Sequence, residues 1–442
     1  LLSLEEARLE RELQAEERRE QREERRAEQE RQHELRLFSM LTGALAVSTQ
    51  ETIKSTPPTS IKACKMFQSV LATARGAETL GPSAYLSNRG NSIRQHQGIL
   101  QEGYVQYATD KHHDTDNPDG IINMGTSENK LCYDLLHKRL TKPEMLNIDP
   151  SLLQYSDWRG HTFLREEVAK FLTHYCCSPN PLKADNVSDR LLLLLLECNT
   201  SNMDSLCKTT ATGLTIRGVI LMNPHNPLAE IYTLEEMIAF LEFAERNELH
   251  SIVDEVYMLS VFDESVAFHS VLSIDSLPNP QRTHVMWGMT KDFAMAGFRI
   301  GTLYTENRDL VEALAQLGSF HGISGTTQRQ VAQLLQDREW ISEVFLPENR
   351  GRLKAAHSYL TGELRSMGVP YLDRPAALYV WVDLRKYLRE SSFEEELSLW
   401  KRFLRHKVVL SCGQAFSCST PGWFRIVFSD QQHHLQLGQS VG

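Results

Sequence analysis

The apolar residues in the second half of the chain follow two patterns, one typical of buried strands and one of amphipathic helices. Residues 214–223 ("LTIRGVILMN") form a near-continuous apolar run, as in a parallel strand covered on both faces. Residues 233–249 have helical spacing, and Thr233 with Glu236 predicts a capping box at the start of that helix. Residues 250–257 ("HSIVDEVY") have the composition of a second strand. The pattern predicts a strand–helix–strand unit with a right-handed crossover.

The same two patterns continue to the C-terminus but change in order. Short apolar runs at 283–287 ("THVMW") and 298–304 ("FRIGTLY") predict two more strands. After three long helices, strands and a helix alternate in a way that suggests a small α+β domain. These later elements are expected as helices at 306–318, 326–336 and 340–367, a strand at 378–384, a helix near 393–406, and strands at 407–411 and 424–429.

The first 84 residues differ in composition from the rest. Residues 1–36 are a low-complexity Glu/Arg tract whose opposite charges, three and four apart, support an exposed helix. We expect a charged helix over 1–38 that can recruit a protein partner. Residues 39–84 are rich in Ser and Thr and predict a flexible linker. The folded body is expected to begin near Tyr85.

Composition narrows the functional class. A formal charge of −10, without a basic patch interleaved with aromatics, argues against nucleic-acid binding. The eight cysteines show no CxxC spacing, which indicates reduced thiols and a cytoplasmic protein. No metal ligand set is predicted. No apolar run reaches membrane-spanning length, so no membrane contact is expected.

Lys291 is the first candidate for chemistry, because it lies between the two predicted strands at 283–287 and 298–304. A lysine at the edge of a buried sheet loses hydration, which lowers its pKa and suits it to nucleophilic amine chemistry. The ordinary alternative is a lysine whose charged end reaches solvent from a loop.

Other polar residues gather at the carboxyl ends of the predicted strands, where ligands of open α/β sheets bind. Asn226 lies between two Asn-Pro steps that hold the chain extended. Asp254 ends an apolar strand, where a carboxylate needs a cationic partner. Tyr257, Arg299 and Arg425 complete the set. Each has an ordinary structural reading as a helix cap, a turn residue, a core residue or half of a surface ion pair.

Together these motifs identify a family resemblance. "NPHNP", "VDEVY" and "TKDFAMAGFRIG" resemble the fold-type-I aminotransferases, which depend on pyridoxal phosphate (PLP). "NPDGIINMGTSENKL" and "YSDWRGHTFLREEVAKFL" resemble the 1-aminocyclopropane-1-carboxylate (ACC) synthase branch, and vertebrate ACC-synthase-like proteins in particular. The resemblance implies an α/β fold, with a large, mostly parallel sheet domain and a smaller α+β C-terminal domain.

The resemblance also implies roles for the candidate residues. Lys291 would hold PLP and later move the substrate's Cα proton, and Asp254 would pair with the pyridinium nitrogen. Glu128 matches a family glutamate near the substrate, with an exposed loop acid as the alternative reading. The remaining roles are hydrogen bonds to the ring oxygen O3′ from Asn226 and Tyr257, phosphate binding by Arg299, and bidentate binding of the substrate carboxylate by Arg425.

Three departures from the family pattern put activity in doubt. Residues 187–213 lack the expected turn that cups the phosphate and the aromatic residue that stacks on the ring. Gly288 replaces the usual serine three residues before the lysine, which removes one phosphate hydroxyl. Trp158 stands where plant-type synthases carry a tyrosine, and Tyr155 does not occupy that position. In addition, Ala229 replaces a glycine, which matters only if that turn needs positive φ.

The prediction is a homodimeric, PLP-binding protein that acts on an amino-acid-like small molecule if active, and is weak or catalytically inactive. The alternative is a non-catalytic dimeric scaffold with an inherited enzyme fold. Beyond the charged helix and linker, the expected domains are an N-terminal arm with part of the small domain (85–150), a large PLP-binding domain partly missing at 187–213 (151–338), and a small C-terminal domain (339–442).

Overall fold

The computed structural model describes residues 83, 85–95, 98–190 and 216–440 of the 442-residue chain. The chain divides into two units, Leu1–Asn91 and Ser92–Gly442. In the first unit the Asn91 side chain makes hydrogen bonds with the backbone N–H and carbonyl of Ser83. Helix α3 (Asn88–Gln95) begins in this unit. The predicted charged helix and nearly all of the predicted linker lie outside the described residues.

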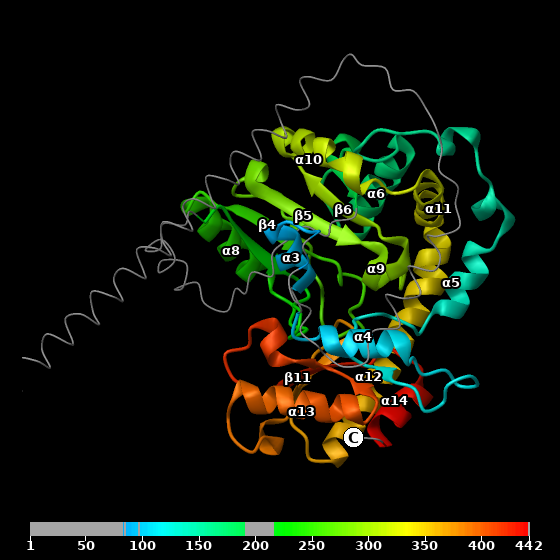
Figure 1. Cartoon of the computed structure of the whole chain (residues 1–442). Helices are drawn as coiled ribbons and strands as arrows, with labels where there is room; N and C mark the ends of the chain where they lie inside the picture. The colour runs from blue at the N-terminus through cyan, green and yellow to red at the C-terminus, as the bar shows by residue number, and fades with distance from the viewer. Residues whose placement is uncertain (1–82, 84, 96–97, 191–215, 441–442) are drawn as a thin grey trace, which may run out of the picture. The chain divides into compact units, whose positions relative to one another are not determined.

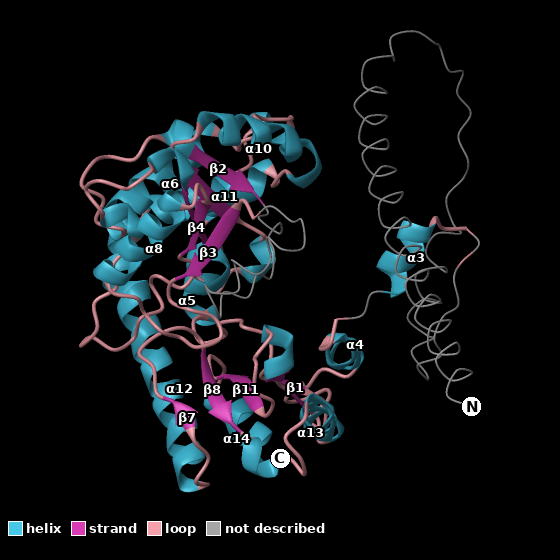
Figure 2. Cartoon of the chain, turned by 90° about the vertical axis from the view of Figure 1, so that its left-hand side faces the viewer, coloured by secondary structure: helices cyan, strands magenta, loops and turns pink. Residues whose placement is uncertain are grey.

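The larger of the two main sheets of the second unit is mixed, with five strands in the order β2-β6-β5-β4-β3 (Figures 1 and 2). Strands β3, β4 and β5 are parallel to one another, and β6 is antiparallel to both of its neighbours. The strands are β2 (Val187–Arg190), β3 (Gly218–Met222), β4 (His250–Asp254), β5 (Thr283–Gly288) and β6 (Gly301–Thr305).

Helices cover this sheet as the apolar spacing requires. The predicted capping box is present: Thr233 accepts from the Glu236 backbone, and the Glu236 carboxylate accepts from Thr233 N. The helices of this region are α6 (Thr162–Tyr175), α8 (Leu234–Arg246), α9 (Met289–Asp292), α10 (Arg308–His321) and α11 (Gly325–Gln336). A π-helical segment (Trp340–Phe345) leads from α11 into the long helix α12 (Leu346–Ser366), which runs beside the smaller sheet (Figure 2).

The smaller sheet is antiparallel, in the order β10-β11-β8-β7. Its strands are β7 (Tyr371–Leu372), β8 (Tyr379–Asp383), β10 (Ser411–Cys412) and β11 (Trp423–Val427), with helix α13 (Phe393–Arg405) between β8 and β10. The α/β fold with a second, C-terminal sheet is therefore confirmed.

The segment before the large sheet joins the C-terminal region instead of forming a unit of its own. Strand β1 (Ile122–Asn123) pairs in parallel with β9 (Val408–Val409), so the predicted strand at 407–411 is divided between this pair and β10. The helices here are α4 (Gln101–Thr109), α5 (Tyr133–Leu140) and the C-terminal α14 (Gln432–Ser440).

The structure differs from the sequence prediction at the start of β6 and covers only part of the segment 187–213. Strand β6 begins at Gly301 and not at residue 298, because Arg299 takes a left-handed conformation with φ of 56° and ends a short 3-10 turn. Of the predicted gap at 187–213, residues 187–190 form β2, and 191–213 lie outside the described residues. Among the described residues, no helix has the length and apolar character needed to span a membrane.

Candidate cofactor and substrate site

Three parallel strands bring the predicted residues to one edge of the large sheet. Met222 of β3 is the Cα partner of Asp254 of β4, and Asp254 is in turn the partner of Met286 of β5. The chain segments that leave these strands therefore start side by side. Asn226 follows β3, Asp254 ends β4, and Lys291 follows β5 on α9.

Asp254 and Lys291 lie close enough for their charges to interact. Burial raises the pKa of the Asp254 carboxyl to about 6, while the Val256 N–H and the Lys291 charge act in the opposite direction. The Val256 N–H donates to Asp254 Oδ1 at 3.1 Å. Lys291 is thus the cationic group that a carboxylate at the end of an apolar strand needs.

Ser127 connects Lys291 to Tyr257. The Lys291 Nζ donates to the Ser127 carbonyl oxygen at 2.5 Å, and the Ser127 hydroxyl lies 2.9 Å from the Tyr257 hydroxyl. Both Ser127 and Tyr257 are buried. Sequence reasoning missed Ser127, although it lies directly before the candidate Glu128.

Arg425 reaches the same segment from the small sheet. Its Nη1 donates to Asn226 Oδ1 at 2.8 Å, and its Nη2 donates to the Gly125 carbonyl oxygen at 2.7 Å. Its Nε is buried and has no hydrogen-bond partner among the residues that the structure describes. A guanidinium carries five donors, so this arginine keeps capacity to bind an anion.

Aromatic rings hold the Arg425 guanidinium in place. The guanidinium carbon lies 4.9 Å from the ring centre of Tyr379 and 4.7 Å from that of Phe416. Tyr379 also contacts Tyr257 edge-on, with ring centres 5.6 Å apart, and donates to the His225 carbonyl oxygen at 3.1 Å. Burial, followed by the neighbouring Tyr257, raises the pKa of Tyr379 well above its usual value. Sequence reasoning treated Tyr379 only as a strand residue.

The structure does not bring Arg299 into this group. Its side chain is exposed, and its Nη1 donates to the Ala296 carbonyl oxygen at 3.1 Å. Glu128 lies beside the group, and its carbonyl oxygen accepts from the Ser429 hydroxyl at 2.7 Å. Burial, together with the Glu128 charge, raises the pKa of Tyr133. The roles of Arg299 and Glu128 stay predictions.

Two buried acids next to the predicted residues also escaped sequence reasoning. The Asp292 carboxylate accepts from the Ser260 hydroxyl at 2.7 Å, from Trp287 Nε1 at 3.1 Å and from Leu259 N at 3.2 Å. Burial raises the pKa of Asp292 and of Glu255 to about 7. Glu255 accepts from the Ser270 hydroxyl at 2.6 Å and from Val271 N at 2.7 Å. Because Glu255 directly follows Asp254 and Asp292 directly follows Lys291, these hydrogen bonds anchor the backbone at both candidate positions.

The positions at which the sequence departs from the expected family pattern can be examined in the structure. A Cβ atom at Gly288 would lie 2.7 Å from the Ile300 carbonyl oxygen and 3.3 Å from the Gly301 Cα, so a serine does not fit without a shift of β6. The turn at Ala229 does adopt positive φ, at 54°, which favours glycine. Trp158 is 43% exposed and Tyr155 is 94% exposed, with ring centres 5.9 Å apart.

Comparison with known proteins agrees with the fold and with the motifs. Residues 196–436 match the aminotransferase class I and II family. An aspartate aminotransferase from Thermotoga maritima has a similar structure, with a TM-score of 0.59 at 18% identity, over 80% of this chain and 98% of that one. That identity is low enough that this likeness concerns the fold alone.

Two curated relatives place the chain more finely. It is 60% identical to 1-aminocyclopropane-1-carboxylate synthase-like protein 1 of Takifugu rubripes over 450 residues, with 89% of this chain and 72% of the relative covered. Because 89% of this chain is fewer than 450 residues, that alignment includes positions at which the relative has residues and this chain has none.

The human protein 2, whose name carries the words "Probable inactive", is 42% identical, with 80% of this chain and 72% of the relative covered. The sequence motifs had suggested protein 2 of this group, and that finer prediction is wrong because the identity to protein 1 is higher. The chain belongs to the aminotransferase class I and II family, within its group of 1-aminocyclopropane-1-carboxylate synthase-like proteins.

Proposed function

We propose that this chain binds PLP at Lys291 and recognises an amino acid through Arg425, with catalytic turnover that is weak or absent. Proteins of this family typically use PLP, and the fold is usually dimeric. One observation carries the proposal: Lys291 follows a strand of the large sheet and Arg425 lies on a strand of the smaller sheet, and both donate to carbonyl oxygens of the segment Gly125–Ser127. An amine and a guanidinium placed on either side of one short segment suit a cofactor and the carboxylate of its amino-acid partner.

The donor set at the ring end fits PLP. Asp254 would face the pyridine nitrogen, Asn226 and Tyr257 would donate to the ring oxygen, and Lys291 would form the covalent bond. When bound, PLP withdraws electrons from the substrate's Cα, which makes a proton at that atom removable. The phosphate end fits less well, because Arg299 is exposed and Gly288 has no hydroxyl and no room for one. This difference between the two ends supports weak cofactor binding.

The residues of this chain would then have distinct tasks. The Lys291 amine would leave the Ser127 carbonyl to reach the cofactor and would afterwards accept or return the Cα proton. Arg425, fixed by Asn226 and the two rings, would hold the substrate carboxylate with its remaining donors. Asp254 would have to be ionised to favour a protonated ring nitrogen, and its raised pKa makes that state pH-dependent.

The first experiment is a visible absorption titration of the purified chain with PLP. We expect a band that depends on Lys291 and is lost in Lys291→Ala. Lys386→Ala is a matched control, since Lys386 also donates to a backbone carbonyl, that of Gly368, but lies on the small sheet's side. A band of equal strength in Lys291→Ala, or no band in the unmodified chain, would contradict the proposal.

A pH series sharpens the same experiment. Because Asp254 has a pKa of about 6, PLP binding is expected to strengthen as the pH rises from 5 to 7. Asp254→Asn removes the titrating carboxyl, so its weaker binding should change less over that range than that of the unmodified chain. An identical pH dependence in the variant would show that Asp254 does not face the ring nitrogen.

The non-catalytic scaffold is the second candidate, and the poorly fitting phosphate end favours it. In that case the chain would show no PLP band and yet remain a dimer by light scattering coupled to size-exclusion chromatography. A chain that binds PLP and changes its spectrum with an amino acid would exclude this reading.

A further inference from the structure

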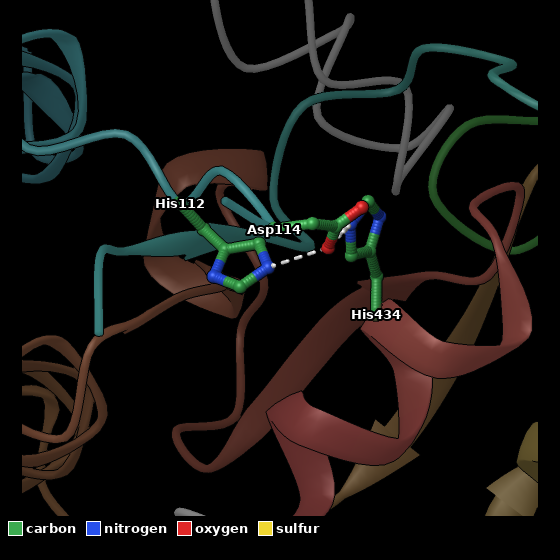
Figure 3. A group of neighbouring side chains, drawn as sticks. All are labelled: His112, Asp114 and His434. Atoms are coloured by element: carbon green, nitrogen blue, oxygen red, sulfur yellow. Dashed lines mark hydrogen bonds and ion pairs between the residues drawn. The ribbon is translucent and has the colours of Figure 1, made fainter. Parts of the chain in front are cut away.

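A cluster of histidines and one aspartate lies outside the proposed cofactor site, between an N-terminal loop and the C-terminal helix. Its members are His112, Asp114 and His434, and their ligand atoms all lie within 4.8 Å of one another (Figure 3). The loop leads into β1, and α14 packs against β1. Packing of α14 against β1 therefore holds together two segments more than 300 residues apart in sequence.

The three side chains converge on a single carboxylate oxygen. Asp114 Oδ1 lies 3.3 Å from His112 Nε2 and 3.4 Å from His434 Nε2. Zinc bonds of about 2.0–2.1 Å place tetrahedral ligand atoms about 3.3 Å apart. The observed separations therefore match two edges of such a tetrahedron. We propose that His112, Asp114 and His434 bind a divalent transition-metal ion, with zinc the best match.

The outer nitrogens of both rings are already oriented for metal binding. His112 Nδ1 lies 2.9 Å from the Pro118 carbonyl oxygen, which can only accept, so Nδ1 carries a proton and Nε2 is the nitrogen that would bind a metal ion. His434 Nδ1 lies 2.9 Å from Asp430 Oδ1. The other Asp430 oxygen bonds Lys130 Nζ at 2.5 Å. A carbonyl or carboxylate behind each ring is the usual outer support of zinc-binding histidines.

A fourth ligand is within reach. His433 Nε2 lies 3.3 Å from the same Asp114 oxygen, and its side chain is 51% exposed, so it can rotate. His433 or a water molecule would complete the tetrahedron. The ring of His112 is only 7% exposed, whereas Asp114 is 59% exposed, so an ion can enter from solvent on the aspartate side.

The competing interpretation is a set of ion pairs between protonated histidines and Asp114, with no metal. The two readings differ in ring charge. A metal requires neutral imidazoles and binds more tightly as the pH rises above the histidine pKa, whereas ion pairs weaken over the same range.

The test uses the full chain, treated with a chelator, dialysed and titrated with Zn²⁺ alone by calorimetry at pH 7.5. We expect one ion per chain and at least tenfold weaker binding in His112→Gln, Asp114→Asn and His434→Gln. His113→Gln is the matched control and should bind as the unmodified chain does, because the exposed His113 side chain bonds Thr115 and Asp116 of the same loop and is not one of the three clustered ligands. Circular dichroism of each variant shows whether it is folded.

Thermal unfolding provides a second readout. Zn²⁺ should raise the melting temperature of the unmodified chain and of His113→Gln, but not that of the three ligand variants. If the folded, unmodified chain does not bind Zn²⁺, the cluster is a set of ion pairs and the proposal is overturned. Binding that survives in all three ligand variants would place the ion elsewhere, with the same consequence.

Discussion

Gly288→Ser introduces the serine that the family resemblance predicts three positions before the lysine, and we expect this substitution to destabilise the protein. The new Cβ would lie 2.7 Å from the Ile300 carbonyl oxygen, well inside normal van der Waals contact. Gly288 and Gly301 are Cα partners in the β5–β6 pair, in the interior of the large sheet, so relief requires β6 to move. That movement would also displace Arg299, two residues before Gly301.

The magnitude follows from the two opposing effects. Overpacking of this kind costs about 1–3 kcal/mol. Replacing glycine recovers roughly 0.4–1 kcal/mol, because the unfolded chain has fewer conformations to lose. The central values, about 2 kcal/mol lost and about 0.7 kcal/mol recovered, give a net loss of about 1.3 kcal/mol in the free energy of unfolding. Urea denaturation followed by tryptophan fluorescence measures this change, and PLP titration of the same samples shows whether the added hydroxyl improves binding.

A matched glycine makes the comparison specific. Gly351 is exposed on α12, and a Cβ there meets nothing within 4 Å. Gly351→Ala should therefore stabilise the chain by roughly 0.5–1 kcal/mol. The reasoning fails if Gly288→Ser is as stable as the unmodified chain, or if it binds PLP more tightly. Either result would mean that β6 yields easily and that the glycine is merely a lost phosphate ligand.

Two further predictions concern buried charges. Arg425→Lys should lower the free energy of unfolding by about 1–3 kcal/mol, because Asn226 and the Gly125 carbonyl each lose a charged donor. The same substitution should abolish any spectral response to amino acids. An unchanged response would show that Arg425 does not bind the substrate. Burial raises the pKa of Asp189 from an ordinary 3.8 to about 7, so its contribution to stability is complete below pH 4 and is lost as the pH rises through 7. The loss between pH 5 and pH 8 amounts to up to about 3 kcal/mol, and urea unfolding should show that Asp189→Asn lacks this part of the pH dependence.

Elements with strong local signals could be predicted from sequence. The helix after Thr233 has both a capping box and an apolar face, and the structure contains it with that cap. The strand ends also placed Asn226, Asp254 and Lys291 at one edge, because parallel strands in register end together. Neither prediction needed contacts between distant segments.

Contacts between distant segments could not be predicted in the same way. Ser127 meets Lys291 across 164 positions of sequence, and no local pattern indicates that a backbone carbonyl will accept from a lysine. The close approach of β6 to Gly288 could not be predicted from the sequence either, because it depends on the pairing register of β5 and β6. The His112 and His434 cluster has no characteristic spacing, because these two residues are more than 300 positions apart in sequence although they lie close together in the structure.

The hydrogen bonds from Lys291 and Arg425 to residues 125–127 have an evolutionary consequence. Both acceptors are main-chain carbonyl oxygens, which every residue type possesses, so a substitution at Ser127 does not delete its acceptor, whereas a Cβ at Gly125 would lie 3.1 Å from the Leu410 carbonyl carbon. Ser127 can therefore change during evolution while Lys291 keeps its hydrogen-bond acceptor, whereas Gly125 is held by the Leu410 backbone. We therefore expect these two hydrogen bonds in members of the group whether or not they catalyse a reaction, so the bonds alone do not indicate activity.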